Sequence, residues 1–319
     1  FSIDANLVGK IDLWDINLKA STNTLNIDRS SEAIRSKLTF SRSIDLNKAN
    51  DRDRNLEKLS DIKFENFVDL EIYSSFREKI NKGYDGEAEI YYGNGLSVAN
   101  RKSWINNYKE TNFILLYSLG DFKAESKSDT KFFNTSRNLF VASIDNRIRL
   151  WEKKSVPKEI DESYKFTPQI IKPSIVWNTA VNSGLFFYGD GSSQEGITFR
   201  SGPDFIFGSL KKNFFDFSRL STRYIYVLKS GQSPFAFDDI NSDERLYFQF
   251  DQQVFGPLIF SFQSYLPLEA GHKDYGDFTD PIYQLEIKRR AYSLAIFYNQ
   301  EEKDLGYKIN IFNFDFSGK

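Results

Sequence analysis

The chain has 319 residues, with 42 lysines and arginines against 44 aspartates and glutamates, which gives a net charge of −2. It therefore lacks the excess of basic residues expected of a nucleic-acid-binding protein. The absence of cysteine excludes disulfides, cysteine nucleophiles and thiolate metal sites. Aromatic residues make up 16% of the chain, which favours β-strands, and the mean hydropathy of −0.48 fits either a soluble protein or a membrane barrel with polar residues at every second strand position.

Strict alternation of apolar and polar residues predicts strands from the start of the chain, because a period of two places one set of side chains on each face of a sheet. Two or three strands with short turns are predicted over 3–20 and 34–40. The stretch 43–61 is rich in Asn, Asp, Arg and Lys and is predicted to be a long solvated loop. Strands are then predicted to resume over 64–72 and 88–92.

Two glycine-containing pairs predict turns in the next part of the chain. Asn94-Gly95 is a strong hairpin signal, because type I′ turns need residues that tolerate positive φ. Gly120-Asp121 also indicates a turn, after the stretch 112–119, which is apolar on both sides. The longest clean strand is predicted over 138–150, with Phe140, Ala142, Ile144, Ile148 and Leu150 on one side and Ser143, Asp145, Arg147 and Arg149 on the other.

The second half of the chain continues this alternation of strands and connections. Polar or glycine-rich connections are predicted at 151–163, 189–193, 233–244 and 271–280, and Phe255-Gly256-Pro257 is predicted to turn the chain. The strands between them are predicted over 175–188, 197–207, 214–228, 246–251, 258–263, 283–288, 292–299 and 307–316. In the last strand, Phe312, Phe314 and Phe316 fall on the face opposite to Ile309 and Ile311, so we expect a bulge or a change of surrounding medium there.

These elements predict an all-β chain of roughly 16–18 strands, with one domain over residues 1–319 and no amphipathic helix or linker. Its longest strongly apolar run, 112–117, is far shorter than the roughly 18 residues of a spanning helix. We predict an antiparallel up-and-down transmembrane β-barrel. The alternatives are a pair of soluble β-sandwiches or a propeller. The charges on nearly every polar face favour the barrel, because a water-filled lumen tolerates them and a sandwich core does not.

Residues that could carry chemistry are few. The only histidine, His272, is predicted to be a solvated loop residue, and no Gly-x-Ser-x-Gly motif accompanies it. The segment 239–243 resembles the start of a calcium loop, but Glu244 replaces the glycine and Phe250 replaces the bidentate carboxylate, so an acidic surface loop is the alternative. Asp274, Asp277 and Asp280 are alternative ligands for divalent ions near a lipid headgroup. We predict no enzyme, no resident metal and no cofactor.

Several short motifs stand out in the second half of the chain: Arg149-Leu150-Trp151, Tyr164-Lys165-Phe166-Thr167-Pro168, Ser233-Pro234-Phe235-Ala236-Phe237-Asp238, Phe255-Gly256-Pro257, Arg289-Arg290-Ala291-Tyr292, Tyr298-Asn299 and Asn313-Phe314-Asp315-Phe316-Ser317-Gly318. In this order and at this spacing they resemble the barrel of the cyanobacterial LptD-like proteins, the outer-membrane lipopolysaccharide-assembly translocons. The stretch from Ser75-Phe76-Arg77 to Tyr91-Tyr92 is similar to the same family, less specifically.

The resemblance implies a barrel in the cell outer membrane whose first and last strands meet weakly. Lipopolysaccharide or a related lipid would leave sideways through that lateral gate, after delivery by a periplasmic bridge protein of the Lpt type. Outer-membrane lipids would surround the barrel, and the motifs themselves are expected at turn and packing positions. The strands 3–13 and 307–316 would form the gate, with the candidate gate residues Leu7, Ile11, Ile309, Ile311, Phe312 and Phe314.

Two features of the chain's ends add expectations about the whole protein. The chain contains no methionine and begins with Phe1, so we expect a fragment whose signal peptide and periplasmic β-domain are absent.

Two rival functions stay open at this point: a porin-like diffusion channel, which needs the same barrel with an open lumen, and a soluble all-β binding module.

Overall fold

The computed structural model describes the chain over residues 3–22, 34–47, 63–81, 87–127, 131–153, 166, 171–289, 291–301 and 303–311. In these ranges no helix is long and apolar enough to cross a membrane. The regular elements are the strands β1 (Ile3–Ile11), β2 (Trp14–Thr22), β3 (Ile34–Asp45), β4 (Lys63–Asn81), β5 (Glu87–Ile105), β6 (Lys109–Glu125), β7 (Phe132–Glu152), β8 (Ser174–Tyr188), β9 (Ser193–Gly208), β10 (Phe217–Gly231), β11 (Asp243–Phe255), β12 (Leu258–Pro267), β13 (Thr279–Lys288), β14 (Tyr292–Asn299) and β15 (Asp304–Ile311).

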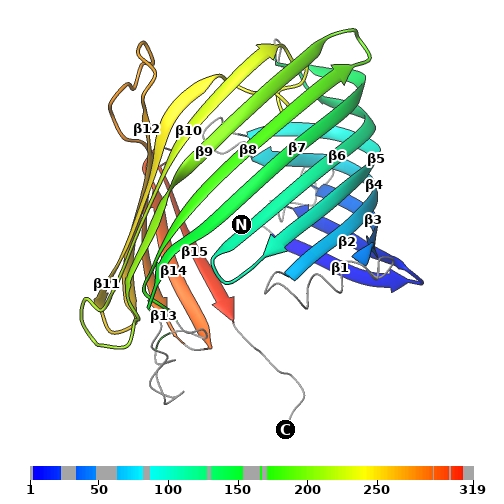
Figure 1. Ribbon diagram of the computed structural model, residues 1–319. Helices are drawn as coiled ribbons and strands as arrows, with labels where there is room; N and C mark the ends of the chain where they lie inside the picture. Colours follow the sequence, from blue (N-terminus) through cyan, green and yellow to red (C-terminus); the bar gives the residue numbers. More distant parts are fainter. Residues whose placement is uncertain are drawn as a thin grey trace.

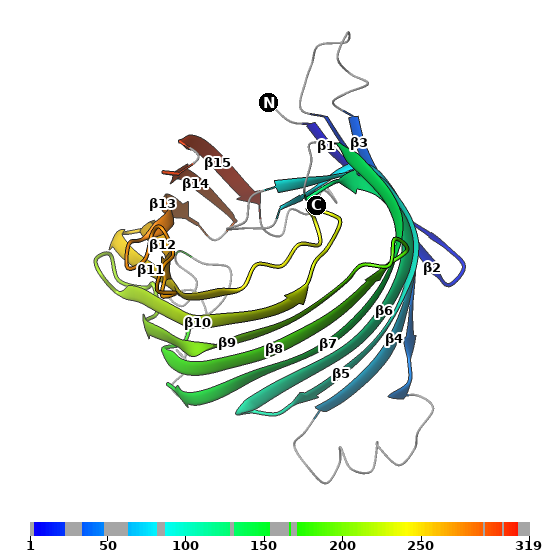
Figure 2. The ribbon, with the colours of Figure 1, turned by 90° about the horizontal axis from the view of Figure 1, so that it is seen from above.

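All of these strands belong to one 15-stranded sheet, in which each strand pairs antiparallel with its neighbours in sequence (Figure 1). This order confirms the predicted all-β class and the up-and-down topology. Viewed from above, the sheet curves into an open C, with β1 to β3 at one end and β14 and β15 at the other (Figure 2). In the described ranges no backbone pairing joins β1 to β15, so the sheet is not closed into a barrel there.

The two predicted turns at Asn94-Gly95 and Gly120-Asp121 are wrong. Both pairs lie inside long strands, β5 and β6, and Gly95 is directly opposite Gly120 in their register. Tyr73 of β4 covers both glycines. A Cβ at Gly95 would lie 2.5 Å from the Tyr73 hydroxyl oxygen, and one at Gly120 would lie 3.0 Å from it. The glycines therefore make room for a tyrosine ring instead of reversing the chain.

In the described ranges the strands are therefore longer, and their number is smaller, than the sequence pattern predicts. The described ranges hold 15 strands, and β7 alone has 21 residues. Other connections agree with the predictions: Gly189 begins the turn between β8 and β9, and Gly256, with φ +51°, sits in the turn between β11 and β12. The predicted loops 43–61 and 151–163 lie mostly outside the described residues, although β3 continues to Asp45.

Small apolar cores form at opposite ends of the sheet's concave side. Ile90, Phe122, Ala124, Tyr188 and Phe235 make one of them, and Phe166, Leu210, Phe217 and Ile259 make the other. A single curved sheet has no second layer to pack against. Its two clusters of buried apolar residues therefore form where connections fold inward over its ends.

Candidate functional site

The sheet's register separates apolar from charged side chains. Along β7, Phe140, Ile144 and Ile148 face outward and are 46%, 39% and 37% exposed. Asp145 and Arg147, between them in sequence, face the concave side. From 138 to 148 no outward residue of β7 is charged, a length of roughly 33 Å along the strand. With a strand tilt of about 40°, that length covers about 25 Å, the height of the apolar band of a membrane barrel.

The same separation extends across the tail strands. In β13 and β14 the outward residues are aliphatic or aromatic and partly exposed, and β15 follows the same order. The outward set is Tyr283, Leu285, Ile287, Tyr292, Leu294, Ile296, Tyr298, Leu305, Tyr307 and Ile309. Continuous exposed apolar surface of this extent is typical of a surface that contacts a membrane or another protein.

The concave side carries hollows lined by polar and charged residues. One, of about 340 Å³, lies over β6 to β10 and contains Arg147, Arg200 and Arg223. Arg223 forms an ion pair with Asp204 at 2.8 Å. A larger hollow of about 720 Å³ lies over β1 to β4. The concave wall is therefore suited to water and polar groups, and the outer wall is suited to hydrocarbon.

One end of the concave side is crossed by the connection between β10 and β11, residues 232–242, which we call the strap. Figure 2 shows this connection inside the C, reaching toward β5 and β6. The amide of Lys127 donates to the carbonyl of Pro234 at 3.1 Å, and that of Ala236 donates to Glu125 at 2.9 Å. The strap is thus hydrogen-bonded, as a short antiparallel bridge, to the end of β6.

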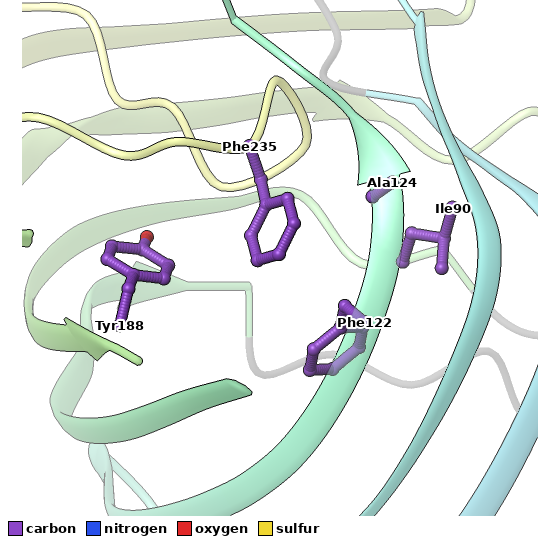
Figure 3. Packing of buried hydrophobic residues seen from close by; sticks show 5 residues of the cluster. All are labelled: Ile90, Phe122, Ala124, Tyr188 and Phe235. Atoms are coloured by element: carbon purple, nitrogen blue, oxygen red, sulfur yellow. The ribbon is translucent and has the colours of Figure 1, made fainter. Parts of the chain in front are cut away.

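Phe235 anchors the strap in the first apolar core. Its side chain is fully buried between Tyr188 and the residues Phe122 and Ala124 (Figure 3). The ring centroids of Phe235 and Tyr188 are 5.8 Å apart, and those of Phe235 and Phe122 are 6.1 Å apart. Edge-on aromatic contacts of this kind stabilise packing beyond the area that they bury.

Ion pairs fix the part of the strap that follows Phe235. Asp238 accepts a hydrogen bond from Arg137 at 2.6 Å, and the two side chains are only 6% and 11% exposed. Asp239 accepts from Lys127 at 2.9 Å and from Lys229 at 2.8 Å. Burial alone would raise the pKa of Asp239, but the hydrogen bonds and charges of Lys229 and Lys127 outweigh it, so that the pKa lies below the ordinary value of 3.8.

Several of the motifs singled out in the sequence meet at the opposite end of the concave side. Phe166 is buried in the second core, and the guanidinium of Arg289 lies 6.0 Å from the centroid of its ring. Gly256 approaches the same ring, since a Cβ there would lie 4.0 Å from it. These motif residues occupy turn and packing positions, as the sequence predicts, and none of them forms a reactive cluster.

Four of the predicted gate residues lie on the two terminal strands of the sheet. Leu7 and Ile11 are 68% and 66% exposed on β1, and Ile309 is 60% exposed on β15. Ile311 is the last residue of β15. Phe312 and Phe314, and with them the predicted change of face, lie outside the described residues. The structure places these strands at the two ends of the C and does not pair them with each other in the described ranges.

Some of the residues considered for metal binding have other partners. No group of three or more potential ligands is clustered anywhere in the described residues. Asp239, the first residue of the calcium-like segment, is engaged by two lysines. His272 lies in the β12–β13 connection, where its Nδ1 accepts from the amide of Asp274 at 3.2 Å. The sequence predicts the strap only as an acidic loop, and the phenylalanine at its start is the one signal that it folds inward.

The family model described as "Protein of unknown function (DUF3769)" matches residues 1–315. No curated protein matches the chain in sequence. The match includes all of the strands from β1 to β15, so the whole sheet, both terminal strands and the strap are part of the matched region.

Proposed function

We propose that this chain, which belongs to the DUF3769 family, is the wall of an outer-membrane translocon that inserts lipopolysaccharide or a related amphipathic lipid into the outer leaflet. The observation that carries the proposal is a single sheet with an apolar outer face, a polar concave face and two terminal strands that are not paired with each other in the described residues. The choice of lipid rests on the resemblance of the second-half motifs to LptD-like barrels.

The path follows from the chemistry of an amphipathic lipid. Its acyl chains are most stable against the outer face, and its polar head is most stable against the concave face. A lipid that enters from the concave side must therefore pass between two strands to place its chains outside. The seam between β1 and β15 is the place where this requires the fewest hydrogen bonds to break, since every pair of strands adjacent in sequence is joined by a backbone ladder.

Closure of that seam is part of the proposal. Unpaired strand edges cannot face hydrocarbon, so β1 and β15 must meet, or be covered, when the sheet is in a membrane. Pairing over strands of 9 and 8 residues is weaker than pairing over strands such as β4 and β5, which have 19 each. The strands beside the seam are short as well, with 9 residues in β2 and 8 in β14, so the seam lies in the part of the wall with the shortest strands.

The test is a disulfide across the seam. The chain has no cysteine, so no thiol within it competes with the introduced pairs. Leu7→Cys or Ile11→Cys is combined with Ile309→Cys or Ile311→Cys in the full-length protein, and lipid export is followed with and without a reductant. We expect the oxidised pairs to stop export and growth, and the reductant to restore both.

The matched control is a disulfide that leaves the seam free. Leu7 is directly opposite Leu18 of β2, so Leu7→Cys with Leu18→Cys joins two strands that are already paired. We expect this bond to leave export unchanged. Complete cross-linking of β1 to β15 with undiminished export would refute the gate.

A porin-like channel is the second candidate, and the polar concave wall favours it equally. The two functions differ in what crosses the wall and where. Steady ion conductance by the full-length protein in a planar bilayer, together with normal export in the cross-linked seam variants, would assign the channel function instead. The strap argues against a wide pore, since it lies across one end of the concave side.

A further inference from the structure

We propose that the hollow over β1 to β4 binds the phosphate or carboxylate groups on the head of an anionic lipid. This inference rests on the proposed lipid path and adds the charge of the ligand and the place where it is held. The hollow has a volume of about 720 Å³ and is open to the concave side. Its lining consists of Asn6, Asn17, Lys19, Ala20, Ser21, Arg35, Ser36, Lys37, Thr39, Ser41, Glu71, Glu78 and Lys79.

Positive charge predominates in this lining. It contains four cationic side chains, on Lys19, Arg35, Lys37 and Lys79, and only two carboxylates, on Glu71 and Glu78. Lys37 forms an ion pair with Glu78 at 2.8 Å. Lys19 and Arg35 have no ion-pair partner among the described residues. Two cations are therefore left to interact with an anion that is not part of the described chain.

The strand register places two of these cations against each other. Lys19 of β2 is directly opposite Lys37 of β3 on the concave face. Like charges in directly opposed positions destabilise a sheet, and a neutral pair would be more stable. Asn17, the preceding residue on the same face, has a buried side-chain oxygen without a hydrogen-bond partner in the described residues. An arrangement that costs stability in the free protein is expected where a ligand compensates for it.

The position of the hollow suits the head of an amphipath at the seam. Asn6 of the terminal strand β1 lines it, so the hollow reaches the free edge of the sheet. On the other face of the same strands, Leu7 and Leu18 are 68% and 37% exposed. A lipid that crosses at β1 would thus meet cations on the concave side and leucines on the outer side. An arginine and a lysine together hold a phosphate or carboxylate by charge-assisted hydrogen bonds.

The proposal is tested with purified protein in dodecyl maltoside micelles that contain either phosphatidic acid or phosphatidylcholine. The double variant Lys19→Gln, Arg35→Gln is expected to bind phosphatidic acid at least about tenfold more weakly than the parent, with phosphatidylcholine binding unchanged. Arg200→Gln, which removes a concave-face arginine from a different hollow, is expected to bind both lipids like the parent. Equal phosphatidic acid binding by parent and double variant would overturn the proposal.

Two further readouts separate a lipid site from a purely structural role of the two cations and from a site for free anions. The double variant is expected to unfold at the same or a higher temperature than the parent, because it relieves the Lys19–Lys37 repulsion. Lower stability together with weaker binding of both lipids would mean a structural role and would overturn the site. Inorganic pyrophosphate is added as a soluble anion, and full displacement of phosphatidic acid at equal concentration would assign the hollow to free anions instead of lipid.

Failure of the anion site can be distinguished from failure of the proposed lateral gate. If the β1–β15 disulfide leaves export intact but the double variant loses phosphatidic acid, the gate fails and the anion site stands. If the disulfide stops export and the double variant still binds phosphatidic acid like the parent, the anion site fails and the gate stands.

Discussion

A single tyrosine, Tyr73, covers two glycines that face each other on neighbouring strands. Its ring occupies the space where side chains of Gly95 and Gly120 would project from the concave face. A bare glycine pair exposes backbone and weakens a sheet, and an aromatic ring laid over it restores the lost packing. Tyr73 also packs against the core that contains Phe122, so its ring connects β4 to the core in which the strap is anchored.

This arrangement predicts that Gly95 tolerates no side chain. A Cβ there would lie 2.5 Å from the Tyr73 hydroxyl and 2.6 Å from the carbonyl oxygen of Leu119, and the second atom belongs to the backbone. We expect Gly95→Ala to destabilise the fold by about 1–3 kcal/mol. Gly9→Ala is the control, because nothing lies within 4 Å of its added methyl group. The temperature at which the folded band disappears from an unboiled gel measures both, and equal values would contradict the packing role.

At the scale of the element, the strap is held by contacts that are distant in sequence. Arg137 and Asp238 are 101 residues apart, and their ion pair is nearly inaccessible to water. We expect Arg137→Ala to release the strap at a cost of about 3–5 kcal/mol, because it removes the cation that compensates the buried carboxylate of Asp238. Lys63→Ala is the comparison: its pair with Glu65 is exposed, so its removal costs about 1 kcal/mol or less. Protease cleavage within 232–242 reports release, and equal cleavage of the two variants would contradict it.

The strap also predicts a response to acid. The folded-state pKa of Asp239 lies below the ordinary value of 3.8, so its ion pairs contribute fully above pH 3.8 and are lost as the pH falls through the lowered value. Pepsin, which works in acid and cuts beside phenylalanine, is a suitable probe because the strap contains Phe235 and Phe237. We expect the parent to resist cleavage at pH 4 and to be cut at lower pH. The Asp239→Asn variant should be cut to the same extent at pH 4 and at the lower pH. Equal cleavage of the parent at the two pH values would contradict the predicted response to acid.

Some features of the strands and connections can be predicted from the sequence alone, and others cannot. The alternation along β7 predicts its two faces correctly, because side-chain direction in a strand depends only on position. The hairpin predicted at Asn94-Gly95 fails, because turn propensity is local whereas the ring of Tyr73 comes from another strand. The strap is visible in the sequence only as an acidic loop, since its partners lie in β6 and β7. The Lys19–Lys37 pair likewise depends on register, which composition does not determine.

At the scale of the whole molecule, the question is what covers the outer face. The soluble alternatives of a sandwich or propeller require apolar side chains to be buried between sheets. The described residues form one sheet only, and its outward Phe140, Leu285 and Ile296 are each more than a third exposed. A curved sheet that keeps charges on its concave side and hydrocarbon on its convex side has the polarity of a barrel wall in a membrane.

Charge substitutions on the two faces distinguish a membrane from water around this wall. Ile144 faces outward near the middle of β7, and Ser143 beside it faces the concave side, where it bonds to Asn182. In a bilayer, an arginine at the midplane costs about 2–4 kcal/mol, so Ile144→Arg should reduce the folded, membrane-inserted fraction sharply. Ser143→Arg should be tolerated, because the concave side already holds several arginines.

A soluble protein would respond in the opposite way. At a position that is 39% exposed to water, Ile144→Arg would be neutral or would improve solubility, whereas Ser143→Arg would break a side-chain hydrogen bond. The comparison is made in the full-length protein by fractionating membranes and running unboiled gels on the membrane fraction. Normal membrane insertion of Ile144→Arg would refute the lipid-facing assignment of the outer face, and with it both the translocon and the channel.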